Sequence, residues 1–250
     1  MIATRIGTKL RGLAMGAVLA GSAAVMATPS MAEDWSGQVT LYGWGAGVTG
    51  DFTPFSGAPT LSFDKSLSEV LEDLDGAFFV TGLARRGDLV LFGDYTYSAS
   101  SRSGVVGGAI PAAGELTIQS LTLAGGRRID VGGGGTLDVL AGLRAWGLEG
   151  SVTSPVANLA PEQSFVDPIV ALRSLTPVSD RVSVLAYLDV GGFGVGSEFT
   201  WLGTVTANYQ ATDSVYISAG WRHLYVDYAE GGTAFEGAMT GPVIGATLRF

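Results

Sequence analysis

Apolar and polar residues alternate along most of the chain after residue 35, in segments of roughly 10 to 14 residues. In one segment Leu89 and Leu91 share a face, while Val90, Phe92 and Asp94 share the opposite face. Such alternation is typical of β-strands, whose successive side chains point to opposite sides of the sheet. The pattern predicts about ten strands, at 38–50, 76–86, 89–98, 115–129, 136–149, 164–176, 181–192, 198–211, 214–228 and 234–250.

The connections between these strands alternate between short turns and longer links. Short turns are expected at Gly87-Asp88, 131–135, 178–180 and 211–213; longer links are expected at 51–75, 99–114, 150–163, 193–197 and 229–233. Bacterial outer-membrane barrels have short periplasmic turns, longer external loops and an even number of strands. The sequence therefore predicts an all-β fold, a transmembrane antiparallel up-and-down β-barrel of about ten strands, with eight or twelve as alternatives. Both chain ends then lie on the periplasmic side.

Composition supports a membrane barrel. The chain has 38 Gly, 47% hydrophobic residues and only 15% charged residues, whereas soluble domains carry about 25% charged residues. After the N-terminal region no segment reaches the roughly 18 consecutive apolar residues that a spanning helix needs. A closed barrel is the other structure that satisfies all backbone polar groups in lipid. The absence of Cys excludes disulfides and thiolate chemistry.

Residues 1–32 have the features of a signal peptide. Arg5, Lys9 and Arg11 form a positive end, an apolar stretch follows over 13–27, and Ser30-Met31-Ala32 provides small residues for cleavage. We therefore expect residues 33–250 to be the mature barrel domain. The whole chain has a formal charge of -9, and the acidic mature part argues against nucleic-acid binding, since phosphate contacts need Lys and Arg.

The last strand carries the most specific local pattern. Ile244, Leu248 and Phe250 alternate with Thr247 and Arg249, and the sequence ends at the aromatic ring. Outer-membrane barrels typically end in such a strand. The expected partners are therefore outer-membrane lipid and the barrel assembly machinery, which would recognise Phe250.

A short amphipathic helix is predicted in the first external link. Ser66 and Glu69 have the spacing of a capping box at a helix start. Apolar residues follow at helical spacing, namely Leu67, Val70, Leu71 and Leu74. This stripe must be buried, so we expect the helix to pack on the barrel mouth or to fold inward as a partial plug. Its role is open between a structural lid and a gate that favours cations.

Five charged residues fall near mid-height of the strands on faces opposite the apolar ones: Asp94, Arg144, Arg173, Asp189 and Arg222. An Arg that faced lipid there would cost about 2–4 kcal/mol, so we expect these side chains to face the lumen. Buried charges need partners, and Arg–carboxylate pairs are expected. They form either a salt-bridged interior that closes the pore or a wet constriction that selects small solutes.

Several segments together resemble one family: WSGQVTLYGWGAG (35–47), SLSEVLEDLDGAF (66–78), RRG (85–87), VDP (166–168), DVGGFGVG (189–196), GWR (220–222) and GPVIGATLRF (241–250). They resemble a group of largely uncharacterised, porin-like outer-membrane β-barrel proteins of Gram-negative bacteria. The resemblance covers nearly the whole mature chain and implies fold and location. It carries no established catalytic residue. His223 departs from the aromatic residue expected after Trp221-Arg222.

Three functions remain open from the sequence. The first is a small porin-like channel for ions or small solutes, and the second is a closed structural or binding barrel. The third is an outer-membrane enzyme, which we do not expect. The single histidine, His223, excludes a multi-histidine metal site. Asp227 lies four residues further along the same strand, about 13 Å away and too far for a direct bond, and no motif links His223 to Ser218. No cofactor is expected.

Overall fold

Long antiparallel strands and one short helix form the part of the chain that the structure, a computed structural model, describes: residues 35–53, 56–57, 60–106, 110–155, 158–160 and 162–250. The predicted signal peptide lies outside these residues. The elements are β1 (Ser36–Trp44), β2 (Gly47–Thr53), β3 (Leu61–Lys65), α1 (Leu67–Asp73), β4 (Leu74–Arg86), β5 (Leu89–Val106), β6 (Ile110–Gly132), β7 (Gly135–Thr153), β8 (Asn158–Leu159), β9 (Glu162–Pro177), β10 (Val182–Gly192), β11 (Phe199–Gln210), β12 (Val215–Glu230) and β13 (Thr233–Arg249).

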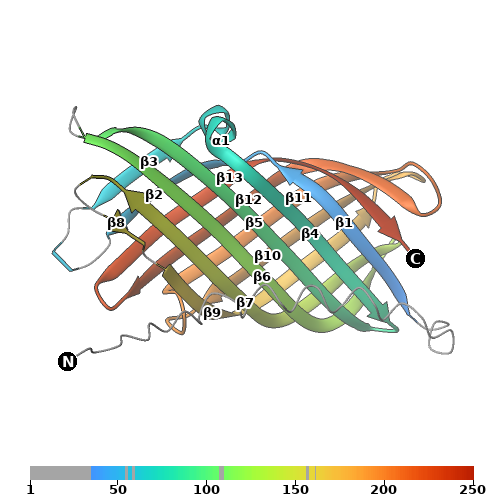
Figure 1. Ribbon diagram of the computed structural model, residues 1–250. Coiled ribbons are helices and arrows are strands. Elements are labelled where there is room, and N and C mark those ends of the chain that lie inside the picture. The colour runs from blue at the N-terminus through green and yellow to red at the C-terminus, as the bar shows by residue number, and fades with distance from the viewer. Residues whose placement is uncertain (1–34, 54–55, 58–59, 107–109, 156–157, 161) are drawn as a thin grey trace, which may run out of the picture. The chain divides into compact units, whose positions relative to one another are not determined.

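Ten of the strands close into a barrel in the order β1-β4-β5-β6-β7-β9-β10-β11-β12-β13, with β13 pairing back to β1 (Figure 1). Gln38 of β1 lies opposite Leu83 of β4 on one side and Arg249 of β13 on the other. The prediction of a ten-stranded antiparallel up-and-down barrel is confirmed. In the described part of the chain, no helix is long and apolar enough to cross a bilayer.

Three short strands lie outside the ten-strand cycle. After the break at Gly45-Ala46, β2 continues along β13, and β3 pairs with β2. The pairing of β1 with β4 runs from Ser36↔Arg85 to Leu41↔Val80. The pairing β13–β2–β3 ends at β3. After β3 the chain forms α1, which leads directly into β4. β8 is a two-residue addition to β7.

The two ends of the barrel differ. At one end, here called the short-turn end, tight connections such as Gly87-Asp88 join the strands, and β1 starts and β13 finishes there. At the other, the long-strand end, β5, β6 and β7 have 18, 23 and 19 residues, whereas β10 and β11 have 11 and 12. The expectation of a long link at 99–114 is wrong, because β5 runs to Val106 and β6 starts at Ile110.

The two faces of each strand have opposite characters. Val90 and Leu140 are buried inside the barrel, whereas Leu123 and Ile244 on the outer wall are 58% and 65% exposed. Exposed apolar residues recur on all sides of the barrel, including Val39, Leu41, Leu91, Leu143, Val170, Leu188, Val205 and Leu248. An outer wall of this kind suits lipid rather than water.

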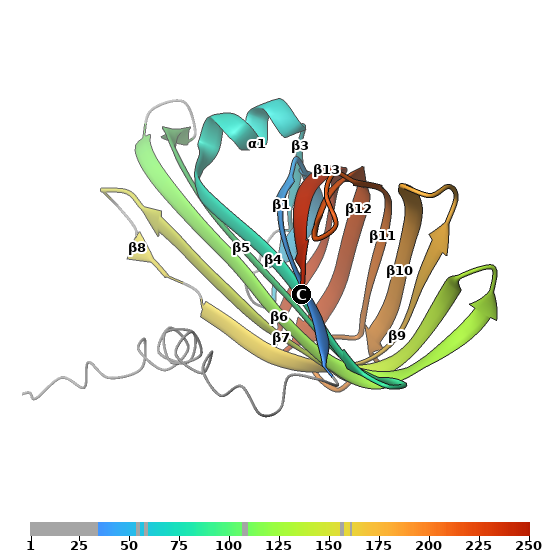
Figure 2. The same cartoon turned by 90° about the vertical axis from the view of Figure 1, so that its right-hand side faces the viewer.

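The predicted helix is confirmed as α1, with Ser66 as its N-cap and the capping box with Glu69 formed. It lies on the rim of the long-strand end (Figure 2) and contacts β2, β3 and β5. Its apolar stripe is buried only in part: Leu67, Val70 and Leu74 are half-buried, whereas Leu71 is 57% exposed. Ion pairs also hold the seven-residue helix: Asp73 pairs with Lys65 at 2.7 Å and with Arg102 at 3.4 Å.

Candidate functional site in the barrel interior

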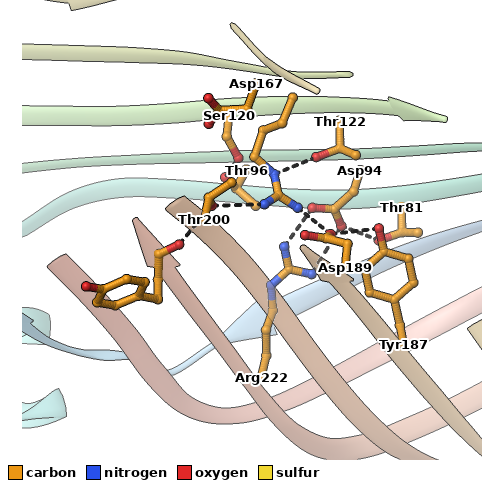
Figure 3. Close-up of polar contacts among 12 residues, drawn as sticks. Thr81, Asp94, Thr96, Ser120, Thr122, Asp167, Tyr187, Asp189, Thr200 and Arg222 are labelled. Carbon is orange, nitrogen blue, oxygen red and sulfur yellow. Dashed lines mark hydrogen bonds and ion pairs between the residues drawn. The ribbon is translucent and has the colours of Figure 1, made fainter. Parts of the chain in front are cut away.

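The barrel interior carries the predicted charges. The structure places Asp94, Arg144, Arg173, Asp189 and Arg222 on inward faces, all of them buried. Four of these side chains, those of Asp94, Arg144, Asp189 and Arg222, form two ion pairs, which we call the clamp. Figure 3 shows Asp94, Asp189 and Arg222 converging from different strands toward the middle of the lumen.

The first pair of the clamp spans the lumen. Arg222 of β12 donates two hydrogen bonds to Asp94 of β5, at 2.6 and 3.2 Å. Three strands separate β12 from β5 on one side of the barrel and five on the other, so this pair joins nearly opposite walls. Tyr42 and Thr81 also donate to the Asp94 carboxylate, at 3.1 and 2.7 Å. Such bidentate, charge-assisted contacts are the strong class of hydrogen bond.

The second pair of the clamp is anchored by Arg144 of β7, which is 1% exposed. Its guanidinium donates to Asp189 of β10 at 2.5 Å, to Thr122 of β6 at 3.0 Å and to Thr200 of β11 at 3.3 Å. The hydroxyl group of Tyr187 donates to the same Asp189 oxygen at 2.8 Å. One arginine thereby links four strands.

Aromatic rings from distant strands also meet inside the barrel. Phe92 of β5 stacks on Tyr187 of β10, with 5.0 Å between the ring centroids. Phe165 of β9 stacks on Tyr228 of β12 at 4.4 Å. Rings from separate walls therefore touch inside the barrel.

Arg173 does not join the other four predicted charges. It pairs with Asp138 of β7 at 3.1 Å, and Asp138 also accepts two hydrogen bonds from Arg128 of β6, at 2.6 and 2.9 Å. The predicted set of lumen charges did not include Asp138 or Arg128, although alternation along 136–149 places Asp138 on the same face as Arg144. Both lie an even number of residues from inward-facing neighbours on the same strand: Asp138 is six residues before Arg144 on β7, and Arg128 is six residues after Thr122 on β6. Extending the inward face toward the strand ends would have found them.

Asp167 is a further buried carboxylate that the prediction missed. It accepts hydrogen bonds from the Trp146 indole N–H at 2.8 Å and from the Ser197 backbone N–H and hydroxyl group at 2.6 and 2.9 Å. Ser197 belongs to the connection between β10 and β11. The carboxylate therefore holds that connection against the inner wall.

A cavity of about 100 Å³ remains inside the barrel. Polar side chains of the strand halves near the short-turn end line much of it, including Gln38, Thr206, Asn208, Ser218 and Thr247, and the clamp residues Asp94, Arg144 and Arg222 line it too. One water molecule occupies about 30 Å³ in the liquid, so the cavity has room for only a few waters.

His223 lies on the outer wall. Its neighbours in sequence, Arg222 and Leu224, are buried inside, and the imidazole stacks on the ring of Trp201 with 4.4 Å between centroids. Together with Trp221 it lines a depression on the outside of the barrel. The histidine therefore faces away from the buried carboxylates of the interior.

Comparison with known proteins identifies the fold. No protein-family model and no curated protein matches the sequence. Among solved structures, the outer membrane protease OmpT from Escherichia coli aligns with a TM-score of 0.53 and 12% identity, over 87% of this chain and 97% of that chain. The translocator domain of autotransporter NalP from Neisseria meningitidis (TM-score 0.47, 13% identity, 87% and 88% covered) and Ail of Yersinia pestis (0.38, 12%, 87% and 99%) also match.

The similarity to OmpT shows the fold alone. The chain has the architecture of Gram-negative outer-membrane β-barrels, and at 12% identity the likeness to a protease transfers no activity. The resemblance to a porin-like family stays a prediction.

Proposed function

We propose that this protein is an outer-membrane β-barrel of a Gram-negative bacterium that is closed to solutes and serves as a structural or binding barrel. One observation carries this proposal: the Arg222–Asp94 pair joins opposite walls of the lumen, with Arg144 and Asp189 beside it. The apolar outer wall supports a location in lipid, and the fold supports the outer membrane.

The proposed orientation places the short-turn end in the periplasm and the long-strand end with α1 outside the cell. Bacterial barrels of known topology have short turns on the periplasmic side. In this proposal residues 1–32 direct export. The final strand presents Phe250, a residue that is 67% exposed, to the assembly machinery.

Conductance of the refolded barrel in a planar lipid bilayer tests the closed state. We expect no current steps above those of the lipid alone for the wild-type protein. We expect Arg222→Ala to produce discrete steps, because truncation removes the side chain that crosses the lumen. Arg127→Ala at the exposed outer surface is the matched control and stays silent. Regular steps from the wild-type protein would overturn the closed-barrel proposal.

A small channel is the second candidate, and the position of the cavities favours it. The interior cavity reaches from the clamp toward the short-turn end, where it shares lining residues, among them Gln38 and Arg173, with a second, open cavity of about 340 Å³. Water can therefore enter half of the barrel. A channel would need only the clamp to move, and voltage-dependent steps in the wild-type recording would support it.

A histidine-dependent enzyme has little support from the geometry. His223 lies on the outer wall beside Trp201, away from the buried acidic residues. We propose no catalytic activity. A hydrolase activity of the refolded barrel that His223→Ala abolishes would contradict this.

A further inference from the structure

The short-turn end of the barrel opens on a cluster of inward-facing arginines. Arg85 of β4, Arg128 of β6, Arg173 of β9 and Arg249 of β13 line the cavity of about 340 Å³ there, together with Gln38 of β1 and other residues. We propose that this arginine vestibule binds a free dianionic oxyanion, such as a phosphate group.

Two of the four guanidinium groups already form ion pairs with a carboxylate. Arg128 and Arg173 share the carboxylate of Asp138, at 2.6 and 3.1 Å. Among the described residues that line this cavity there are four arginines and no Asp or Glu, so its lining is basic.

The other two guanidinium groups have no acidic partner. Among the described residues, no carboxylate lies within 4.0 Å of Arg85 or Arg249. Arg85 makes one hydrogen bond of 3.3 Å to the carbonyl oxygen of Gly87. A buried or half-buried guanidinium group that lacks an acidic partner can bind an anion, because its planar N–H groups donate hydrogen bonds that match the geometry of phosphate and carboxylate oxygens.

Arg249 is also held in place. Its guanidinium lies over the ring of Tyr216, 3.8 Å from the ring centroid. Its Nε is buried and has no hydrogen-bond partner among the described residues. A donor left in that state favours an added acceptor, and the stacked, preorganised arrangement lowers the entropy lost on binding.

The location defines the source of the ligand. The four arginines lie on the inward faces of their strands, as Leu83 and Thr247 on the same faces of β4 and β13 do. The anion must therefore come from the aqueous side of the opening, not from a lipid headgroup at the outer wall. The vestibule lies on the short-turn side of the clamp, so binding there requires neither a closed nor an open lumen.

Titration of inorganic phosphate into the folded barrel in zwitterionic detergent tests the proposal. Isothermal calorimetry should show saturable binding with one phosphate per barrel. At equal ionic strength, chloride should give no saturable signal, which separates a site from screening of charge. Absence of saturable phosphate binding, or an equal response to chloride, would overturn the proposal.

Two variants and a control assign the site. Arg249→Gln and Arg85→Gln should each weaken phosphate binding by about tenfold or more, since each removes a charge-assisted contact. Arg127→Gln changes an exposed arginine one residue from Arg128 on the outer face and should leave binding within about twofold of wild type. Circular dichroism confirms that each variant is folded, and Arg85→Gln serves if Arg249→Gln does not fold. Equal loss in the Arg127→Gln control would show nonspecific attraction and contradict the site.

Discussion

At the scale of single residues, the barrel interior is governed by the cost of an unpaired charge. Asp94 is buried with Arg222, and its carboxylate also accepts hydrogen bonds from Tyr42 and Thr81. Removing one member of a buried pair leaves the other charge without compensation, whereas replacing both with apolar residues of similar volume is often neutral.

Asp94→Ala should therefore destabilise the barrel by about 3–5 kcal/mol, because it leaves Arg222 buried and unpaired. The double variant Asp94→Leu with Arg222→Met should recover most of that loss. Unfolding by guanidinium chloride in detergent, followed by tryptophan fluorescence, measures both. A double variant as unstable as the single one would contradict the account of the clamp as a charge pair.

For single residues, the sequence best predicted whether a side chain points into the barrel or outward. Alternation on β5 placed Val90, Phe92 and Asp94 on the inner face, and all three are buried. The pairing of Asp94 with Arg222 was out of reach, because residues 128 positions apart meet only through the curvature and register of the closed sheet. Arg173 pairs with Asp138 rather than with the clamp for the same reason.

At the scale of elements, close packing between strands depends on glycine at a few positions. A Cβ on Gly220 of β12 would lie 1.9 Å from the carbonyl oxygen of Val205 on β11. At Gly82 of β4 the same atom would meet nothing within 4 Å. Both glycines lie inside strands of the barrel wall, Gly82 in β4 and Gly220 in β12.

Gly220→Ala should cost about 1–3 kcal/mol through overpacking, since backbone atoms must shift to admit the methyl group. Gly82→Ala is the matched control and should be neutral or slightly stabilising. The same denaturant titration compares them. Equal effects of the two substitutions would show that the close approach of β11 and β12 is not a constraint.

The stability of the rim helix α1 depends on the ionised carboxylates of Asp73 and Glu69, so it should vary with pH. The hydrogen bond from the Lys65 ammonium lowers the pKa of the Asp73 carboxyl group below its ordinary value, and the Ser66 hydroxyl and backbone N–H lower the pKa of Glu69. Lowered pKa values mean that both groups stabilise the folded rim above the ordinary carboxyl range, near pH 4. That contribution is lost as the pH falls through the lowered values.

Hydrogen exchange at residues 67–73, corrected for intrinsic rates, should show weakening protection as the pH falls from about 5 to 3. Asp73→Asn should show reduced protection already at neutral pH, because the amide cannot pair with Lys65 and Arg102. Protection that stays constant over this range would contradict the role of the ion pairs.

The sequence predicted element positions well where one face meets lipid. Where a strand faces lipid, apolar residues occur at every second position. The predicted strands 164–176 and 198–211 therefore agree closely with β9 and β11. The sequence predicts a loop over 99–114, where β5 and β6 extend at the long-strand end. There the Ser- and Gly-rich sequence lacks the apolar alternation, as expected where a strand no longer faces lipid on one side.

At the scale of the whole molecule, the barrel combines an apolar outer wall with a charge-paired interior. Ten strands enclose a lumen that is wider than a filled eight-stranded barrel and narrower than a large porin. Strand number alone leaves it open whether solutes pass. In our proposal the lumen is closed, because side chains of the clamp and the stacked rings from separate walls touch.

A solid-state NMR measurement of the barrel in lipid bilayers tests this central claim most directly. With labelled Arg and Asp, we predict a through-space contact between the Arg222 guanidinium nitrogens and the Asp94 carboxyl carbon, and Asp94→Asn should abolish the carboxyl signal of Asp94. A wild-type spectrum without that contact, with the Arg222 guanidinium in rapid exchange with water, would show an open lumen and contradict the account.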